Sequence, residues 1–124
     1  MIAALWLLLV PARQADSAAT TLRQVIAAEH HPTMRWGNLR DVRSTLETTY
    51  QARSWRLLWS SAGQATPAAR RLVRELDSAA ARGLDPADYD AQRLDAITDS
   101  LAVMPAAARA EYDVMLSAAV SRYV

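Results

Sequence analysis

The chain has 124 residues, of which 52% are hydrophobic, and its 14 basic side chains, all arginine, nearly balance 13 acidic ones to leave a formal net charge of +1. This length fits one domain with a modest core, and so weak a charge does not indicate nucleic acid or an anionic membrane surface as a partner. There is no cysteine, which excludes a disulfide framework, a thiolate metal site and a cysteine nucleophile.

The first segment is an uncharged apolar run over residues 2–10, shorter than the ~20 residues needed to cross a bilayer. Such a run is typical of the hydrophobic region of a secretory signal, and small residues follow at a spacing that a signal peptidase recognises, ending at Ala12 or at Ala19. We therefore expect residues 1–19 to be a signal peptide or leader. The protein is then exported to the periplasm or cell envelope, and it contacts a membrane only through an uncleaved leader.

Two helices are predicted next from helical periodicity. The first is expected from about Thr20 to Glu29, and Pro32 ends it because the residue before a proline avoids the helical region. The second is expected to follow Asn38 as its N-cap. The apolar faces of these helices consist of Leu22, Val25 and Ile26 and of Leu39, Val42, Leu46, Thr49 and Tyr50.

The middle of the chain begins with residues 53–59, which lose the helical period and are expected to be extended or to form an irregular turn. Residues 60–65 are predicted to be a loop. Thr66 and Pro67 are typical of an N-cap and a first helical position, so a third helix begins there. Its buried face is expected to consist of Ala69, Leu72, Val73, Leu76, Ala79 and Ala80.

The stretch from Gly83 to Tyr89 is expected to end one helix and begin another. Gly83 tolerates positive φ and so closes the preceding helix, while Leu84 folds back onto it. Asp85 is then an N-cap and Pro86 occupies the first helical position.

Helical spacing continues in two further segments, residues 90–102 and a last helix that begins at Pro105. No stretch alternates with period two for long enough to predict a sheet, so we expect an all-α fold, a small bundle of five or six short helices preceded by an apolar leader. The pattern is still running at Val124, and we expect the domain to be truncated at its C-terminal end. The apolar residues of these segments are Leu94, Ile97 and Leu101, then Ala108, Tyr112, Met115, Leu116, Ala119, Val120 and Tyr123.

The titratable residues do not form a recognisable active site. His30 and His31 are adjacent and point about 100° apart on a helix, so they cannot hold one metal ion together. No glycine-rich phosphate loop or Ser/His/Asp pattern is present, and we expect no catalytic residue, no metal site and no cofactor. Surface solvation is the expected state of five carboxylates, Asp85, Asp88, Asp90, Asp95 and Asp99.

One patch is a candidate binding surface, namely Arg53, Trp55 and Arg56. An indole beside guanidinium groups stacks on a sugar ring or contacts a peptide. The alternative is that the aromatic side chains of this region fill an alanine-rich core. We favour the core for Trp59, and for Trp55 both interpretations stay open.

Several of these segments, in this order, resemble the N-terminal scaffold domain of the large L,D-transpeptidases, the peptidoglycan cross-linking enzymes of the bacterial periplasm. The segments are His31-Pro32 with Arg35-Trp36, Tyr50-Gln-Ala-Arg53-Ser-Trp55-Arg-Leu-Leu58-Trp59, Thr66-Pro67, Gly83-Leu84-Asp85-Pro86-Ala87-Asp88-Tyr89, Tyr112-Asp113-Val-Met-Leu116-Ser117 and Arg122-Tyr123. The sequence departs from the family pattern at Arg56-Leu57, where the family often has a proline, and at Ser117, where threonine is more usual. The resemblance implies structural roles for Trp36, Tyr50, Trp59, Thr66, Pro67, Gly83, Leu84, Asp85, Pro86, Tyr89, Arg122 and Tyr123.

In that family the scaffold precedes a peptidoglycan-binding module and a catalytic domain with a cysteine nucleophile helped by a histidine, and neither domain is found in this chain. Without a cysteine the acyl-transfer chemistry cannot be assigned to any position. The resemblance therefore implies that residues 20–124 are a non-catalytic scaffold domain that supports peptidoglycan cross-linking. Its partner is the catalytic domain, normally in the same polypeptide, and peptidoglycan is a further candidate partner.

The alternatives belong to other classes of protein. A stand-alone exported helical adaptor would bind a protein partner through an exposed patch at Trp55 and Trp59, and would have no need to bind peptidoglycan. A small independent enzyme is the weakest alternative, because it would need a pocket with convergent titratable groups that the sequence does not supply.

Overall fold

The computed structural model describes residues 16–124. Within this range the prediction of an all-α fold with five or six helices is confirmed, since five α-helices are joined by three short 3₁₀ helices and one small hairpin. The α-helices are residues 16–28, α2 (Arg43–Ala52), α3 (Pro67–Asp77), α4 (Ala91–Thr98) and α5 (Ala106–Tyr123); the 3₁₀ helices are η1 (Ala79–Arg82), η2 (Pro86–Tyr89) and η3 (Leu101–Val103); the strands are β1 (Ser60–Ser61) and β2 (Gln64–Ala65). None of the helices in this range has the length and apolar character needed to span a membrane.

The first described helix begins at residue 16, four residues earlier than expected. Ala18 is buried and belongs to the same core as Leu22, Val25 and Ile26. A signal peptidase cut after Ala19 would therefore remove the first turn of this helix from the core. The other candidate cut, after Ala12, and the rest of the predicted leader through residue 15 lie outside the described residues.

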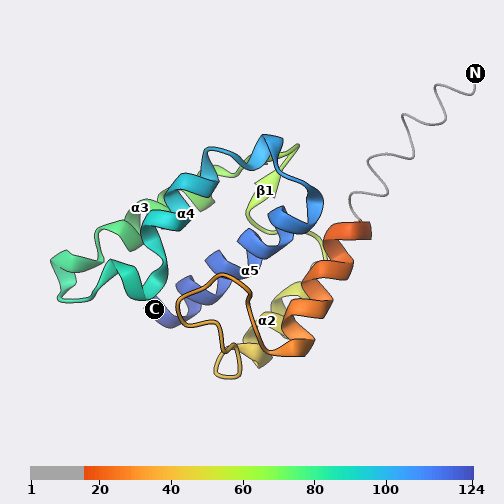
Figure 1. Cartoon of the computed structure of the whole chain (residues 1–124), viewed down its shortest axis with the longest axis horizontal. Coiled ribbons are helices and arrows are strands. Elements are labelled where there is room, and N and C mark those ends of the chain that lie inside the picture. Colours follow the sequence, from red (N-terminus) through yellow and green to blue (C-terminus); the bar gives the residue numbers. More distant parts are fainter. Residues whose placement is uncertain (1–15) are drawn as a thin grey trace, which may run out of the picture.

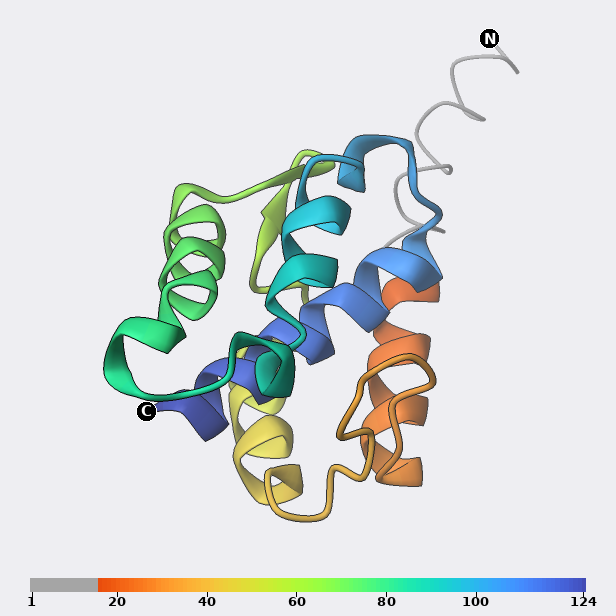
Figure 2. The same ribbon diagram turned by 60° about the vertical axis from the view of Figure 1, so that its left-hand side comes forward.

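Helix α5 runs through the middle of the molecule. Figures 1 and 2 show α3 and α4 on one side of it and α2 with residues 16–28 on the other, and α2, α3, α4 and η2 all contact it. Every residue from 112 to 119 is buried, so α5 has no solvent face over these two turns, in contrast to the single apolar face expected from the sequence. Alanines at 110, 118 and 119 allow the neighbouring helices to approach closely.

Helix α2 begins four residues later than predicted, with Val42 in place of Asn38 at the N-cap position. Asn38 does not cap it, because the Asn38 Oδ1 atom accepts a hydrogen bond from the Arg40 backbone N at 3.0 Å and closes a turn before the helix. The apolar side chains of this region are nevertheless buried, Leu39 and Val42 from the turn and Leu46 and Tyr50 from the helix.

Residues 60–65, predicted to be a loop, form the hairpin of β1 and β2, in which Ser60 pairs with Ala65. Ala62 and Gly63 connect the strands with φ values of 52° and 79°, the positive values that the commonest two-residue hairpin turn requires. Two-residue strands are too short to show alternation in a sequence, and for this reason periodicity misses them.

Helix α3 starts as predicted. Thr66 Oγ1 accepts a hydrogen bond from the Ala69 backbone N at 3.1 Å, and Pro67 occupies the first helical position. The buried face ends at Ala79, and the prediction that Ala80 is buried is wrong. The reason is the change from the α-helical period to the 3.0 residues per turn of η1, which rotates Ala80 away from the core.

The connection after η1 has the expected capping geometry. Gly83 has a φ of 77°, the Leu84 backbone N donates to the Ala79 carbonyl at 3.1 Å, and Asp85 accepts from the Ala87 backbone N at 3.0 Å. The helix that Asp85 caps is the 3₁₀ helix η2.

Candidate functional site

A buried polar cluster joins α2, α5 and the turn between α2 and β1. The Asp113 carboxylate accepts hydrogen bonds from the Tyr50 hydroxyl and from the backbone N atoms of Leu58 and Trp59, the latter two at 3.0 and 2.9 Å. One turn further along α5, the Ser117 Oγ atom lies 2.9 Å from the Tyr50 hydroxyl and accepts from the Trp59 indole N at 2.8 Å. These five residues, called the Asp113 cluster here, hold the irregular segment 53–59 against the central helix.

The electrostatics of the Asp113 cluster are those of a structural site. Burial raises the pKa of Asp113, and its hydrogen bonds with Tyr50, Leu58 and Trp59 oppose that rise. Burial, with the negative charge of Asp113, also holds the pKa of Tyr50 well above its ordinary value, so the phenol remains a proton donor. Both carboxylate oxygens are occupied by donors from the fold itself, and the side chain is fully buried.

Sequence reasoning missed the importance of Asp113, which entered only as part of a family segment. The available signal is its position, since it is the one charged residue between Tyr112 and Ser117 in an otherwise apolar run. A charge at the centre of such a run is rarely buried without partners. Its partners were not predictable locally, because Leu58 lies 55 residues earlier in the chain.

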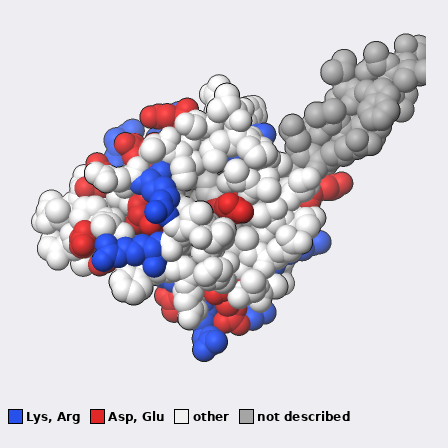
Figure 3. Space-filling view, in the orientation of Figure 1, with Lys and Arg blue, Asp and Glu red and all other residues white. Residues whose placement is uncertain are grey.

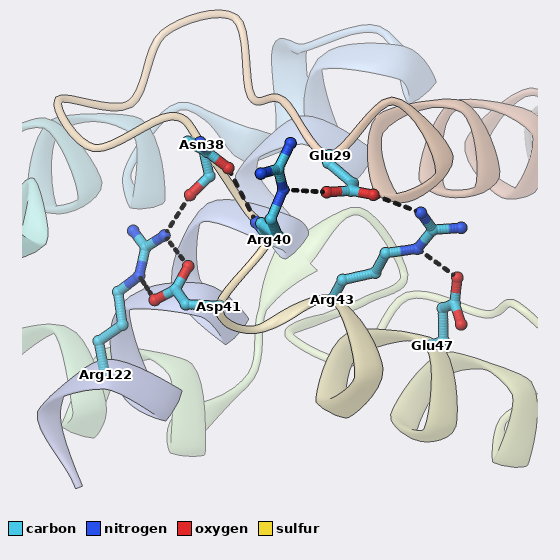
Figure 4. Close-up of polar contacts among 7 residues, drawn as sticks. All are labelled: Glu29, Asn38, Arg40, Asp41, Arg43, Glu47 and Arg122. Carbon is cyan, nitrogen blue, oxygen red and sulfur yellow. Dashed lines mark hydrogen bonds and ion pairs between the residues drawn. The ribbon is translucent and has the colours of Figure 1, made fainter.

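The last turn of α5 carries a second set of contacts, made by Arg122 (Figure 4). Its guanidinium donates to both carboxylate oxygens of Asp41 at 2.9 and 2.8 Å and to the backbone carbonyls of Trp36 and Asn38 at 2.8 and 2.7 Å. The hydrogen bond from Arg122 lowers the pKa of Asp41. Arg122 thus ties the loop of residues 30–42 to the end of the central helix.

The other side of that loop is held by a neighbouring ion cluster, also seen in Figure 4. Glu29 accepts from Arg40 at 3.2 Å and from Arg43 at 2.5 Å, and Arg43 also donates to Glu47 at 2.9 Å. The hydrogen bond from Arg43, followed by that from Arg40, lowers the pKa of Glu29. Arg43 and Glu47 are four residues apart, the spacing at which side chains on one face of a helix form an ion pair.

Aromatic residues gather around the same end of α5. Tyr123 meets Tyr89 edge to face at a centroid distance of 5.4 Å, and the Arg82 guanidinium lies 5.7 Å from the Tyr123 ring. Trp36 remains 55% exposed although its indole N donates to Asp88 at 3.3 Å. Leu84 is also exposed.

Of the five carboxylates expected at the surface, Asp90 is buried, and that prediction is wrong for this residue. Its two oxygens accept from the Arg35 backbone N at 3.2 and 3.3 Å, which gives the buried carboxylate a partner from a distant loop. Asp85, Asp95 and Asp99 are exposed, and Asp88 is half-buried.

The two histidines differ in environment. His30 is exposed, whereas His31 is buried, with its Nε2 atom 2.7 Å from the Glu111 carbonyl and its Nδ1 atom accepting from the Thr33 backbone N at 3.2 Å. Burial lowers the pKa of His31. His31 therefore serves as a neutral core residue, and among residues 16–124 no three His, Cys, Asp or Glu side chains are grouped closely enough to hold a metal ion.

Two cavities border the predicted residues. One, of about 820 Å³, lies between residues 33–35 and residues 85–93 and contains Arg35 and Arg93. The other, of about 490 Å³, is lined by all three residues of the candidate binding surface, Arg53, Trp55 and Arg56. The structure thus brings these three side chains to one cavity.

A comparison with protein-family models matches residues 44–124, from the first turn of α2 to the last residue, to the family described as Scaffold domain. Searches of curated proteins and of solved structures found no significant match. The helix of residues 16–28, which precedes the matched range, packs into the same core. The chain belongs to the scaffold domain family.

Proposed function

We propose that this chain is the non-catalytic scaffold domain of a periplasmic L,D-transpeptidase, and that it supports peptidoglycan cross-linking by a catalytic domain. The family match supports the scaffold assignment. The link to L,D-transpeptidases rests on the segments that resemble that family and on how these segments meet in the fold.

The observation that carries the proposal is that segments distant in sequence hold one another in place. The segment of residues 50–59 is bound by Asp113 and Ser117, which belong to the segment of residues 112–117. Arg122 binds the carbonyl of Trp36, and Tyr123 packs on Tyr89. A set of residues that together build one rigid frame is expected to be retained as a unit in a supporting domain, and this is the role that the resemblance implies.

The chemistry of the chain favours support over catalysis. Acyl transfer in the family requires a cysteine nucleophile, and this sequence has none. The buried groups with raised pKa values are engaged within the fold, Asp113 with Tyr50 and with the Leu58 backbone N, and Tyr112 with the Thr98 hydroxyl. In this proposal the reaction takes place on the catalytic domain, and the apolar run of residues 2–10 directs the protein to the periplasm or cell envelope.

The alternative of a stand-alone adaptor would place an exposed aromatic patch at Trp55 and Trp59. Both side chains are half-buried and pack against the core, and the Trp59 indole N is bound by Ser117. These contacts favour the scaffold over the adaptor.

The proposal is tested by binding of the full chain to the catalytic domain of an L,D-transpeptidase encoded in the same genome, measured by isothermal titration calorimetry. Saturable binding, together with faster cross-linking of peptidoglycan by the catalytic domain, would support it. Reading the gene beyond codon 124 gives an independent test, since a transpeptidase reading frame with a cysteine and a histidine is expected. Absence of binding to any such domain, with an in-frame stop and no transpeptidase gene nearby, would overturn the proposal.

A further inference from the structure

Three arginines around Trp55 have no carboxylate partner among the described residues. The Arg23 guanidinium lies 5.1 Å from the Trp55 ring, and Arg53 and Arg56 line the cavity of about 490 Å³ beside it. Seven other arginines of the described range do have a carboxylate oxygen within 4.0 Å: Arg35, Arg40, Arg43, Arg70, Arg82, Arg93 and Arg122. Within that range Arg71, Arg74 and Arg109 have no such partner either, so the distinguishing feature is that Arg23, Arg53 and Arg56 lie around one indole. Together with Trp55 they are called the arginine pocket here. Asp16 also lines the cavity, and three arginines against this one carboxylate leave an excess of positive charge.

Two of the three guanidinium groups of the arginine pocket donate hydrogen bonds to neutral acceptors. Arg53 donates an Nη2 hydrogen bond to the Leu57 carbonyl at 3.1 Å, and Arg56 donates from Nε to the Arg53 carbonyl at 3.0 Å. These bonds orient both side chains without cancelling their charge. A ligand that supplies negative charge would meet donors that are already placed, which reduces the entropy lost on binding.

The backbone at this site is strained. Ser54 and Trp55 have φ values of 56° and 61°, a region that costs a non-glycine residue about 1–2 kcal/mol. The two residues are consecutive, and the turn that they form brings Arg53, Trp55 and Arg56 to the same cavity. Strain of this kind concentrates at ligand-binding sites.

The chemistry of the ligand follows from which groups of the arginine pocket are already in contact with other protein groups. The Trp55 ring packs nearly parallel to Tyr50 at a centroid distance of 6.5 Å and lies against the Arg23 guanidinium, so protein groups cover the indole that a sugar ring would need for stacking. The excess of arginines over acidic side chains instead favours an anion, and a guanidinium group matches the geometry of a carboxylate or a phosphate. The charge on the face drawn in Figure 3 is mixed, with acidic and basic atoms side by side.

The larger cavity carries less evidence for a ligand. Its two arginines, Arg35 and Arg93, already have carboxylate oxygens of Asp88 and Asp90 at 3.9 and 3.7 Å. A second anion there would compete with the protein's own acidic groups.

We propose that the arginine pocket binds carboxylate groups on the peptide stems of peptidoglycan. The choice of a carboxylate of peptidoglycan over a phosphate rests on the function proposed above, whereas the preference for an anion rests on the pocket itself. The domain would then bind the peptidoglycan strand that its catalytic partner cross-links.

The test is co-sedimentation of the full chain with purified peptidoglycan sacculi, compared with the same sacculi after their carboxyl groups have been amidated by carbodiimide and methylamine. We expect binding to the intact sacculi only. Arg56→Gln is expected to weaken that binding roughly tenfold, the effect of losing one hydrogen bond to a charged group. Arg56 is exposed and makes one intramolecular hydrogen bond, so this variant is expected to keep the wild-type melting curve.

The matched control is Arg71→Gln, because Arg71 is exposed on α3, away from the arginine pocket. This variant is expected to bind intact sacculi as the wild-type chain does. Equal binding of amidated sacculi, or wild-type affinity of a folded Arg56→Gln variant, would overturn the inference. So would binding to phosphatidylglycerol vesicles in place of sacculi, which would assign the pocket to a membrane. If the chain binds the catalytic domain but not sacculi, only this inference fails and the proposed function stands.

Discussion

Replacement of Asp113 tests whether the Asp113 cluster holds the fold together through hydrogen-bond acceptance. In Asp113→Ala the backbone N–H groups of Leu58 and Trp59 lose their acceptor, while the Tyr50 hydroxyl keeps Ser117. Each half-buried donor left without a partner costs about 1–3 kcal/mol, so two of them predict a loss of about 2–6 kcal/mol. That is a large part of the ~5–15 kcal/mol by which a small domain is stable.

Asp113→Asn is the matched control, because it keeps the shape and removes the charge. Its Oδ1 atom can accept from Leu58 and Trp59, and its amide can donate to the Tyr50 oxygen while the Tyr50 proton turns to Ser117. Every polar group then retains a partner, and the expected loss stays below about 1.5 kcal/mol. Urea unfolding followed by tryptophan fluorescence measures both values, and equal m-values for the three proteins show that the comparison is valid.

The pH dependence gives a second measurement on the same residue. Burial raises the pKa of Asp113 above its ordinary value of 3.8, so the native state binds this proton more tightly than the unfolded state does. The contribution of Asp113 to the free energy of unfolding therefore falls as pH rises from about 3.8 through the higher folded pKa, and Asp113→Asn should abolish this component. An Asn variant as unstable as the Ala variant would refute the reasoning, as would a loss below about 1 kcal/mol for Ala.

Three further substitutions probe separate contacts. His31 has a pKa lowered by burial and accepts from Thr33 at Nδ1, so the free energy of unfolding should fall as pH drops from about 6.5 through the lower folded pKa, and urea titrations of His31→Gln should lack that slope. In the same assay, Arg122→Gln should lower the free energy of unfolding by about 2 kcal/mol. Arg122→Lys should not restore that loss, because an ammonium group cannot reproduce the planar contacts of Arg122 to one carboxylate and two carbonyls. A lysine variant as stable as the wild type would contradict this account. Gly83→Ala should lower the free energy of unfolding by about 1 kcal/mol, because the φ of Gly83 is 77° while open space surrounds the position of an added methyl group. Gly37→Ala should lower it by more, because the added Cβ would lie 2.7 Å from the His31 carbonyl oxygen. Equal melting temperatures for the two alanine variants would show that this clash is relieved.

The features that could be predicted from the sequence are those that neighbouring residues determine. Thr66 and Pro67 specify a helix start through one hydrogen bond within three residues, and Gly83 specifies a reversal through its own φ. The fold class also followed from periodicity, which each helix expresses independently of its neighbours. Asn38 shows the limit of local reasoning, because its side chain caps a turn instead of the helix that follows.

The features that could not be predicted depend on contacts between distant segments. Asp113 reaches residues 54 and 55 positions away, and Arg122 reaches Asp41 across 81 positions. The complete burial of residues 112–119 also has no signature in amphipathicity, because a helix surrounded on all sides has no polar face to mark its orientation. For the arginine pocket, the sequence indicated Arg53, Trp55 and Arg56, but Arg23 comes from another helix and only the structure adds it.

The central position of α5 has a consequence for the time at which the protein acquires its structure. During synthesis, residues 16–104 emerge before α5, which contacts α2, α3, α4 and η2, so the apolar side chains of these elements lack this packing partner until residues 106–123 are available. Short early segments of this kind are marginal in water on their own. The polypeptide should therefore stay loosely packed and sensitive to proteases while it is being made, and then fold in one cooperative step once residues 106–123 are free.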